Sequence, residues 1–354
     1  MSHIYSSLKA FAYGDRLAVI GQGRVPAPVH VRIKPTNVCN HACYFCAYRK
    51  PDLSLGSGMV ERDRIPREKM REIVEDLIAM GIAAVTFSGG GEPLIYPFIG
   101  ETVERLGAAG LRLGMLTNGS RLLGKTAQMI APHMTWVRVS IDGWDGPSYA
   151  RYRGVEMDAF ATVIENLSAF VRLAPRCTVG ASIIVDADNA PHLFDLARTL
   201  KDAGVAQVKV SPCILHDDGA ANNAYHRPLA ATVAAELASC RELEDGRFTI
   251  VDHYHDSDES YDKPYHRCAM TNLLTVIGAD CRVYTCQDKA YTDSGCLGSV
   301  REIRFRDFWR SPELAQRLAA LDPAAHCRHH CVADAKNRML DDFLRLDPAH
   351  APFV

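Results

Sequence analysis

The chain has 354 residues, of which 47% are hydrophobic and 23% charged, and its 40 basic and 42 acidic residues leave a formal charge of -2. These values are typical of a soluble protein with one large domain and a smaller one, and they exclude the strongly basic composition of many nucleic-acid-binding proteins. No apolar run reaches the roughly 18 residues that cross a bilayer, and the N-terminus lacks a secretion signal. We therefore expect a cytoplasmic protein without a nucleic-acid or membrane partner.

Short strands and helices alternate through the first 212 residues. Expected strands cover residues 29–34, 82–87, 112–117, 135–141, 178–185 and 205–211. Amphipathic spacing predicts helices between them, for example over 70–78, 157–173 and 190–203. Six such strand-helix units predict an α/β fold with a parallel sheet and external helices.

The alternation ends near residue 211. One helical segment, 229–243, precedes a polar loop, a hairpin near 273–286 and a helical tail. We expect an N-terminal extension over 1–27, the α/β domain over 28–212, a connection over 213–262 and a small C-terminal domain over 263–345.

Clustered cysteines point to metal binding. The chain has 12 cysteines, and in a reducing cytoplasm short cysteine clusters favour metal over disulfides. Cys39, Cys43 and Cys46 follow the first expected strand with CxxxCxxC spacing. A closed zinc site or an electron-transfer cluster usually takes four protein ligands, so three leave one iron open to an exogenous chelate. Taken alone, the spacing also fits zinc or unrelated thiols.

A glycine-rich segment, SGGGEPL at 88–94, ends the second expected strand. Together with CxxxCxxC and Phe45 before its last cysteine, it resembles the radical S-adenosylmethionine (radical SAM) superfamily. The resemblance covers the N-terminal two-thirds of the chain. It implies a partial (β/α)6 barrel and a [4Fe-4S] cluster on Cys39, Cys43 and Cys46, whose free iron is chelated by S-adenosylmethionine.

The resemblance also assigns contacts to S-adenosylmethionine. Phe45 would lie near the adenine, and Gly90 and Gly91 would contact the methionine part. Glu92 would help to fix the amino group of the methionine part. Further contacts are expected from the LTNGS, VSIDG and RYRG segments, at Asn118, Ser140 and Arg153.

The C-terminal cysteines resemble a second family feature, the twitch domain, a shortened relative of the SPASM domain. This implies an auxiliary [4Fe-4S] cluster ligated by Cys268, Cys286, Cys327 and Cys331. Two departures from the family pattern leave alternatives open. The position of Cys281 is usually glycine, and the final pair is often CxxC, so Cys281 or Cys296 could replace one of the four ligands. Zinc bound to the same thiolates is the other alternative.

The resemblance implies reductive cleavage of S-adenosylmethionine and hydrogen abstraction by a 5′-deoxyadenosyl radical, with a flavodoxin- or ferredoxin-type electron donor. An auxiliary cluster with four protein ligands favours net oxidation, and epimerisation, which would also need a hydrogen donor, is the related possibility. We expect a small, polyhydroxylated sugar- or aminocyclitol-like substrate, because only about 28 residues precede the first strand. A peptide-modifying maturase and a non-catalytic iron-sulfur or zinc scaffold are the competing hypotheses.

A polar loop before Cys268 is expected to cover the mouth of the barrel. Its side chains could bind hydroxyl or amino groups of a substrate or accept its proton. These candidates are His253, His255, Asp256, Asp258 and Tyr261.

Overall fold

The computed structural model describes residues 5–255, 261–329, 331–347, 349–350 and 353, in which ten strands form one sheet of order β10-β9-β8-β1-β2-β3-β4-β5-β6-β7. The strands are β1 (His30–Ile33), β2 (Ala84–Phe87), β3 (Arg112–Thr117), β4 (Met134–Ser140), β5 (Thr178–Val185), β6 (Gln207–Pro212), β7 (Thr249–Asp252), β8 (Leu274–Ile277), β9 (Arg282–Tyr284) and β10 (Cys296–Ser299). Neighbours from β1 to β7 pair in parallel, as do β1 and β8.

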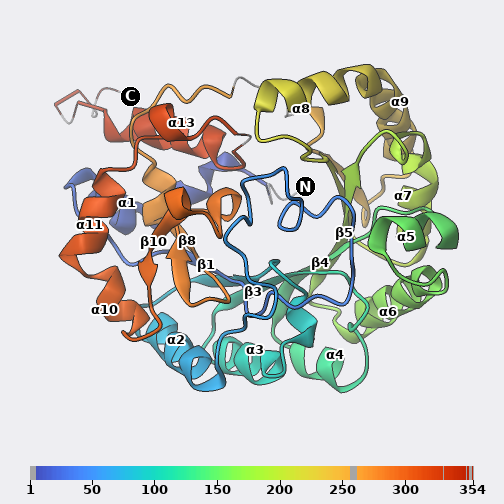
Figure 1. Cartoon of the computed structure of the whole chain (residues 1–354), viewed down its shortest axis with the longest axis horizontal. Coiled ribbons are helices and arrows are strands. Elements are labelled where there is room, and N and C mark those ends of the chain that lie inside the picture. Colours follow the sequence, from blue (N-terminus) through green and yellow to red (C-terminus); the bar gives the residue numbers. More distant parts are fainter. Residues whose placement is uncertain (1–4, 256–260, 330, 348, 351–352, 354) are drawn as a thin grey trace.

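The helices lie around the outside of this curved sheet (Figure 1). In chain order they are α1 (Gly14–Gly21), α2 (Arg67–Ala79), α3 (Ile99–Ala108), α4 (Gly124–Ile130), α5 (Gly146–Arg153), α6 (Ala159–Leu173), α7 (Leu193–Asp202), α8 (Gly219–His226), α9 (Ala230–Arg241), α10 (Phe305–Trp309), α11 (Pro312–Ala319), α12 (Pro323–His326) and α13 (Asp334–Leu344). Single 3-10 turns include η1 (Ser7–Tyr13), η6 (Ala269–Asn272) and η7 (Gln287–Lys289).

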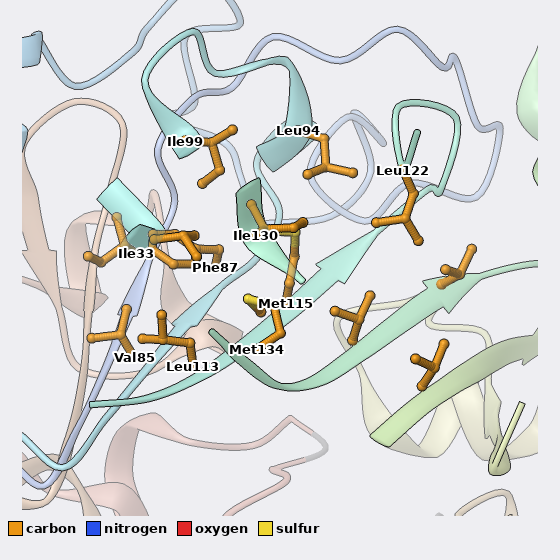
Figure 2. Packing of buried hydrophobic residues seen from close by; sticks show 14 of the residues in the cluster. Ile33, Val85, Phe87, Leu94, Ile99, Leu113, Met115, Leu122, Ile130 and Met134 are labelled. Atoms are coloured by element: carbon orange, nitrogen blue, oxygen red, sulfur yellow. The ribbon is translucent and has the colours of Figure 1, made fainter. Parts of the chain in front are cut away.

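The main core lies between the sheet and its helices. Side chains alternate between the two faces of a strand, so Val31 and Ile33 of β1 share the face that packs on the helices. Register places Val85 and Phe87 of β2 on the same face, and Figure 2 shows them beside residues from α3 and α4. Aliphatic side chains thus fill the outer face, which leaves the opposite face free for polar groups.

The predicted α/β fold with a parallel sheet is confirmed, and the sheet is open. Two features go beyond the sequence pattern. The connection over 213–262 contains a further parallel strand, β7, and a further helix, α8. The C-terminal hairpin β8–β9 extends the main sheet, because β8 pairs with β1.

The N-terminal and C-terminal segments pack together beside this hairpin. Leu17 and Ile20 of α1 share a small core with Leu273 and with Leu340 of α13. The two segments therefore support the C-terminal cysteines from one side.

Candidate active site

The loop after β1 carries the three N-terminal cysteines close together. Cys39, Cys43 and Cys46 are partly buried, and the Cys46 amide donates to the Cys43 carbonyl at 3.2 Å. Burial raises the pKa of the Cys39 thiol, and the charges of Glu92 and Cys43 raise it further. Burial likewise raises the pKa of Cys43, and Cys46 adds to that shift. Cys43 therefore lies within electrostatic range of both Cys39 and Cys46.

The glycine-rich turn after β2 packs directly against the cysteine loop. A Cβ on Gly91 would lie 1.9 Å from the Val38 carbonyl oxygen, and a Cβ on Gly90 would lie 2.2 Å from Asn37 Oδ1. Gly90 also has φ 106, a conformation that glycine adopts without strain. Both glycines are therefore needed for the loop to approach, whether or not they contact a ligand.

Glu92 ties the ends of two strands together. Its carboxylate is buried and accepts hydrogen bonds from Thr117 Oγ1 at 2.6 Å, the Asn118 amide at 2.7 Å and the Leu94 amide at 2.9 Å. Burial raises the pKa of Glu92, whereas these hydrogen bonds lower it. A carboxylate has about four acceptor sites, so one remains for a further donor.

Arg153, near the end of α5, connects two predicted elements of the site. It forms a buried ion pair with Asp142, with side-chain exposures of 5% and 0%, and its Nη1 lies 3.6 Å from Cys43 Sγ. The guanidinium also lies 5.5 Å from the ring centroid of Phe45. Sequence reasoning expected Arg153 to hold a carboxylate of S-adenosylmethionine, and in this arrangement Asp142 already occupies one side of it.

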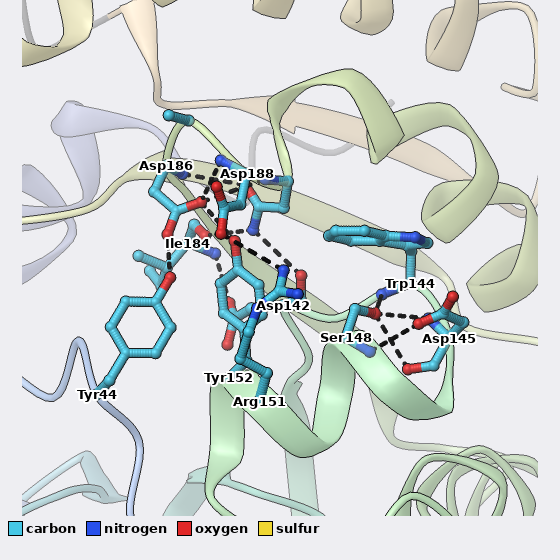
Figure 3. A network of polar contacts seen from close by, with 12 residues as sticks. Tyr44, Asp142, Trp144, Asp145, Ser148, Arg151, Tyr152, Ile184, Asp186 and Asp188 are labelled. Carbon is cyan, nitrogen blue, oxygen red and sulfur yellow. Dashed lines mark hydrogen bonds and ion pairs between the residues drawn. The ribbon is translucent and has the colours of Figure 1, made fainter.

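A polar network at the ends of β4 and β5 fixes this edge of the sheet (Figure 3). Tyr44 and Tyr152 both donate hydrogen bonds to Asp186, which follows β5. Asn189 donates to the carbonyls of Asp142, at 3.1 Å, and Ile184, at 2.9 Å. Sequence reasoning missed Asp186, although its place directly after a buried strand was an available signal.

The remaining predicted contacts lie at the same edge. The Asn118 side chain donates to Asn40 Oδ1 at 3.0 Å, so it joins β3 to the cysteine loop. Ser140 Oγ lies 3.4 Å from Ser182 Oγ, across β4 and β5. Phe45 packs against Tyr44 and Tyr152, with ring centroids 5.5 and 6.0 Å apart.

Several buried polar atoms around the cysteine loop have no hydrogen-bond partner among the described residues. They are His41 Nδ1, Ser88 Oγ, Tyr149 Oη and Arg153 Nε. Such atoms are costly unless a ligand or water satisfies them. Together with three soft thiols, they fit a site that holds an iron-sulfur cluster and a zwitterionic ligand.

The four predicted C-terminal cysteines also gather. Burial raises the pKa of Cys268, and the charge of Cys327 adds to it. Desolvation places the pKa of Cys286 well above its usual value, with further contributions from Cys331 and Cys268. Burial raises the pKa of Cys331 to about 12, and Cys268 again contributes.

An amide from α13, which sequence reasoning missed, holds one of these thiols. Asn337 Nδ2 donates to Cys268 Sγ at 3.3 Å, and the Met270 amide donates to Asn337 Oδ1 at 2.9 Å. The second bond fixes the amide orientation, so the N–H group must face the sulfur atom.

Cys281 and Cys296 have other neighbours. Cys281 is 1% exposed in the main core, with φ 61 in the turn between β8 and β9, and Arg301 and Asp280 are its charged neighbours. Cys296 Sγ contacts the Gly298 carbonyl at 3.7 Å and packs near Tyr284. Cys281 thus occupies a left-handed turn position that favours glycine.

The spacing of the cysteine thiols is relevant to the kind of metal centre that they could hold. As placed in the described part of the chain, no three His, Cys, Asp or Glu side chains converge closely enough to hold a single metal ion. In a [4Fe-4S] cluster each thiolate binds its own iron, so the sulfur atoms stand farther apart than around one zinc ion, with its bonds of about 2.3 Å. Thiolates are soft ligands that suit iron-sulfur clusters and zinc alike.

Three of the five candidates in the polar loop before Cys268 lie within the described residues. His253 packs edge-on against Tyr5 at 5.5 Å, and His255 Nδ1 lies 2.9 Å from Asp252 Oδ2. Tyr261 donates to Asn223 Oδ1 at 2.7 Å. The other two candidates, Asp256 and Asp258, lie outside the described residues.

Two further features lie away from the site. A shallow charged pocket on the helical side of the sheet is lined by residues of α2 and α3 and by Arg304, and it includes neither cysteine group. In the described ranges, no helix combines the length and apolar composition that a bilayer crossing requires.

Comparison with known proteins identifies the class. Residues 33–189 match the model of the Radical SAM superfamily. The structure is similar to that of Streptococcus suis SuiB bound to precursor peptide SuiA, with a TM-score of 0.63 and 15% sequence identity. The match covers 87% of this chain and 70% of the SuiB chain. Residues 33–189 therefore belong to the radical SAM superfamily.

Three curated relatives match parts of the chain. A S-adenosylmethionine-dependent nucleotide dehydratase of Flammeovirga pacifica is 32% identical over 29% of this chain and 35% of its own length. The dTDP-4-amino-4,6-dideoxy-D-glucose ammonia-lyase of Streptomyces venezuelae is 29% identical over 50% of this chain and 37% of its own length. Mycofactocin maturase MftC of Mycobacterium ulcerans is 29% identical over 48% of this chain and 44% of its own length. The chain thus spans less than half the length of each of these three relatives.

Proposed function

We propose that this radical SAM enzyme oxidises or epimerises a small, polyhydroxylated substrate, and that it contains two [4Fe-4S] clusters. The observation that carries the proposal is the presence of two separate thiol groups, one of three cysteines and one of four, on adjoining parts of one sheet. The first group leaves a coordination position open, whereas the second does not.

The residues of the first group define the radical-generating site. Cys39, Cys43 and Cys46 would hold a [4Fe-4S] cluster, which in its reduced state would supply the electron for cleavage of S-adenosylmethionine to methionine and a 5′-deoxyadenosyl radical. Arg153 places positive charge beside Cys43, which stabilises the thiolate form of that ligand. The Gly90–Gly91 turn and Glu92 hold the neighbouring strand ends in place for S-adenosylmethionine.

The residues of the second group support net oxidation. Cys268, Cys286, Cys327 and Cys331 would hold a second cluster with four protein ligands, and the chemistry it would supply is electron acceptance or relay. Asn337 stabilises that site through its N–H group on Cys268. A flavodoxin- or ferredoxin-type protein is the proposed reductant.

The proposed substrate class is supported by one relative, the dTDP-sugar ammonia-lyase, which matches half of this chain. The alternative of a peptide-modifying maturase is supported by the match to mycofactocin maturase. Polar inward-facing residues of the sheet suit a hydroxylated ligand, because hydroxyl groups need hydrogen-bond partners when buried.

Deuterium transfer tests the proposal. The anaerobically reconstituted protein is incubated with S-adenosylmethionine, dithionite and carbon-deuterated sugars or aminocyclitols. We expect deuterium in 5′-deoxyadenosine with at least one of these compounds and no 5′-deoxyadenosine from a Cys43→Ala variant. Deuterium transfer from peptides alone would favour the maturase, and absence of 5′-deoxyadenosine in the unaltered protein would contradict the proposed chemistry.

A further inference from the structure

The face of the sheet turned away from α2 to α9, called the inner face here, is basic. Strand register places Arg32, Arg138 and Lys209 on this face, together with polar residues such as Thr86 and Ser182. Among the inner-face positions of β1 to β8, all of which are described, neither Asp nor Glu occurs. The strand positions of the inner face thus carry basic side chains and no acidic ones.

Arg32 stands out among these cations because its guanidinium is not paired. It is partly buried in the middle of β1, and no described residue forms a hydrogen bond or an ion pair with it. Arg138, by contrast, donates to the Tyr5 hydroxyl. A guanidinium has five donors in a fork that matches carboxylate and phosphate groups. Burial lowers the pKa of Arg32, so an anionic acceptor at this position would favour its charged form.

Lys34, the residue directly after β1, lies two residues beyond Arg32 and so on the same face. It is 1% exposed, and its Nζ donates to Tyr48 Oη at 2.8 Å and to the Gly89 carbonyl, both neutral acceptors. Burial, reinforced by the charge of Arg32, lowers the pKa of Lys34 to about 7. A bound anion would offset both effects.

The two cations lie between the two cysteine groups. Arg32 is within electrostatic range of Cys286, and Lys34 is within range of Cys46. The carboxylate of Asp288, whose Oδ2 is buried without a hydrogen-bond partner, attracts both cations but ion-pairs with neither in the described structure. A ligand anchored here would lie between the proposed site of radical formation and the proposed electron acceptor.

We propose that Arg32 and Lys34 bind an anionic group of the substrate, a phosphate or a carboxylate, on the inner face between the two cysteine groups. The proposal rests on the proposed function, since it concerns the substrate of the same site. Arg32 supplies the bidentate contact and Lys34 a second charge. The proposed substrate is then a small, polyhydroxylated compound that carries a phosphate or a carboxylate.

Two binding measurements on the reconstituted protein test this, with inorganic pyrophosphate and succinate as separate probes. Calorimetry compares the unaltered protein with Arg32→Gln and with Arg198→Gln, a control at an exposed arginine paired with Asp195. We expect Arg32→Gln to weaken binding of at least one probe by about tenfold or more, and Arg198→Gln to leave it unchanged. The probe that binds identifies phosphate or carboxylate recognition.

The second measurement needs no variant and therefore does not depend on its folding. Phenylglyoxal modifies arginine side chains, and mass spectrometry reports the modification of Arg32 and Arg198. We expect one probe to protect Arg32 and not Arg198. Lack of Arg32-dependent binding and of protection with both probes would overturn the proposal. Neither readout involves cleavage of S-adenosylmethionine, so the anion site and the proposed function can fail separately.

Discussion

The phenol of Tyr48, two residues after Cys46, donates a hydrogen bond of 3.3 Å to the backbone carbonyl of Gln287, the residue that follows Cys286. The same hydroxyl accepts from Lys34 at 2.8 Å. One side chain therefore joins the loop of the first cysteine group to the loop of the second. The two groups are held by a direct contact as well as by the shared sheet.

Tyr48→Phe removes this link while keeping the ring. We expect the free energy of unfolding to fall by about 1–2 kcal/mol, because a buried Lys34 loses an acceptor and a carbonyl loses a donor. Chemical denaturation measures the change. Tyr13→Phe, in η1 and outside both cysteine groups, is the matched control and should change stability by less than about 0.5 kcal/mol. An equal loss in both variants would contradict the role of the Tyr48 hydroxyl.

Arg153→Leu leaves the carboxylate of Asp142 buried and without its partner. Breaking a buried ion pair from one side costs about 3–5 kcal/mol of unfolding free energy. Arg151→Leu removes a pair with Asp188 whose side chains are 55% and 61% exposed, so it should cost less than about 1 kcal/mol. Denaturant unfolding of both variants under the same conditions checks the contrast. A small effect of Arg153→Leu would show that Asp142 gains another partner.

Asn337→Leu removes the N–H group that faces Cys268. A hydrogen bond to a cluster ligand favours the more negative, reduced state, so its loss should lower the potential of one cluster by on the order of 50 mV. Potentiometric titration followed by electron paramagnetic resonance measures it. Asp342→Ala, at an exposed position of the same helix, is the control. A shift of both clusters, or of neither, would contradict the assignment of Asn337 to the auxiliary site.

His30 provides a pH dependence. Its Nε2 lies 2.8 Å from Thr86 Oγ1, and burial, with the charge of Arg32 nearby, lowers its pKa to about 3. Between that value and the ordinary pKa of 6.5 the unfolded chain binds a proton that the folded chain does not, so stability falls as pH falls. Relative to His30→Asn, the unaltered protein should lose about 1.4 kcal/mol between pH 7.5 and 5.5. A constant difference between the two proteins would contradict the shift.

The sequence predicts most of the α/β domain because its signals are local. The spacing of Met70, Ile73, Val74 and Leu77 is enough to predict α2, and CxxxCxxC is a contiguous pattern. The four residues of β7 are all partly buried and show no alternation, so their place in the sheet depends on pairing with β6. Periodicity could not reveal that strand.

Some contacts of the site join residues that are far apart in the sequence, and local patterns do not predict such contacts. Asn337 is 69 residues from Cys268, and no local pattern connects them. Spacing also left Cys281 open as a ligand. Cys281 lies in a buried turn with φ 61, a backbone conformation that favours glycine. Sequence spacing does not report this conformation.

The iron content of matched cysteine variants tests the central claim most directly. After anaerobic reconstitution, we predict about eight iron atoms per chain in the unaltered protein and about four each in Cys43→Ala and Cys286→Ala. Cys281→Gly, which suits the turn and removes only a thiol outside the four, should keep about eight. About four irons in the unaltered protein, or a loss of four irons in Cys281→Gly, would contradict the assignment of a second cluster to Cys268, Cys286, Cys327 and Cys331.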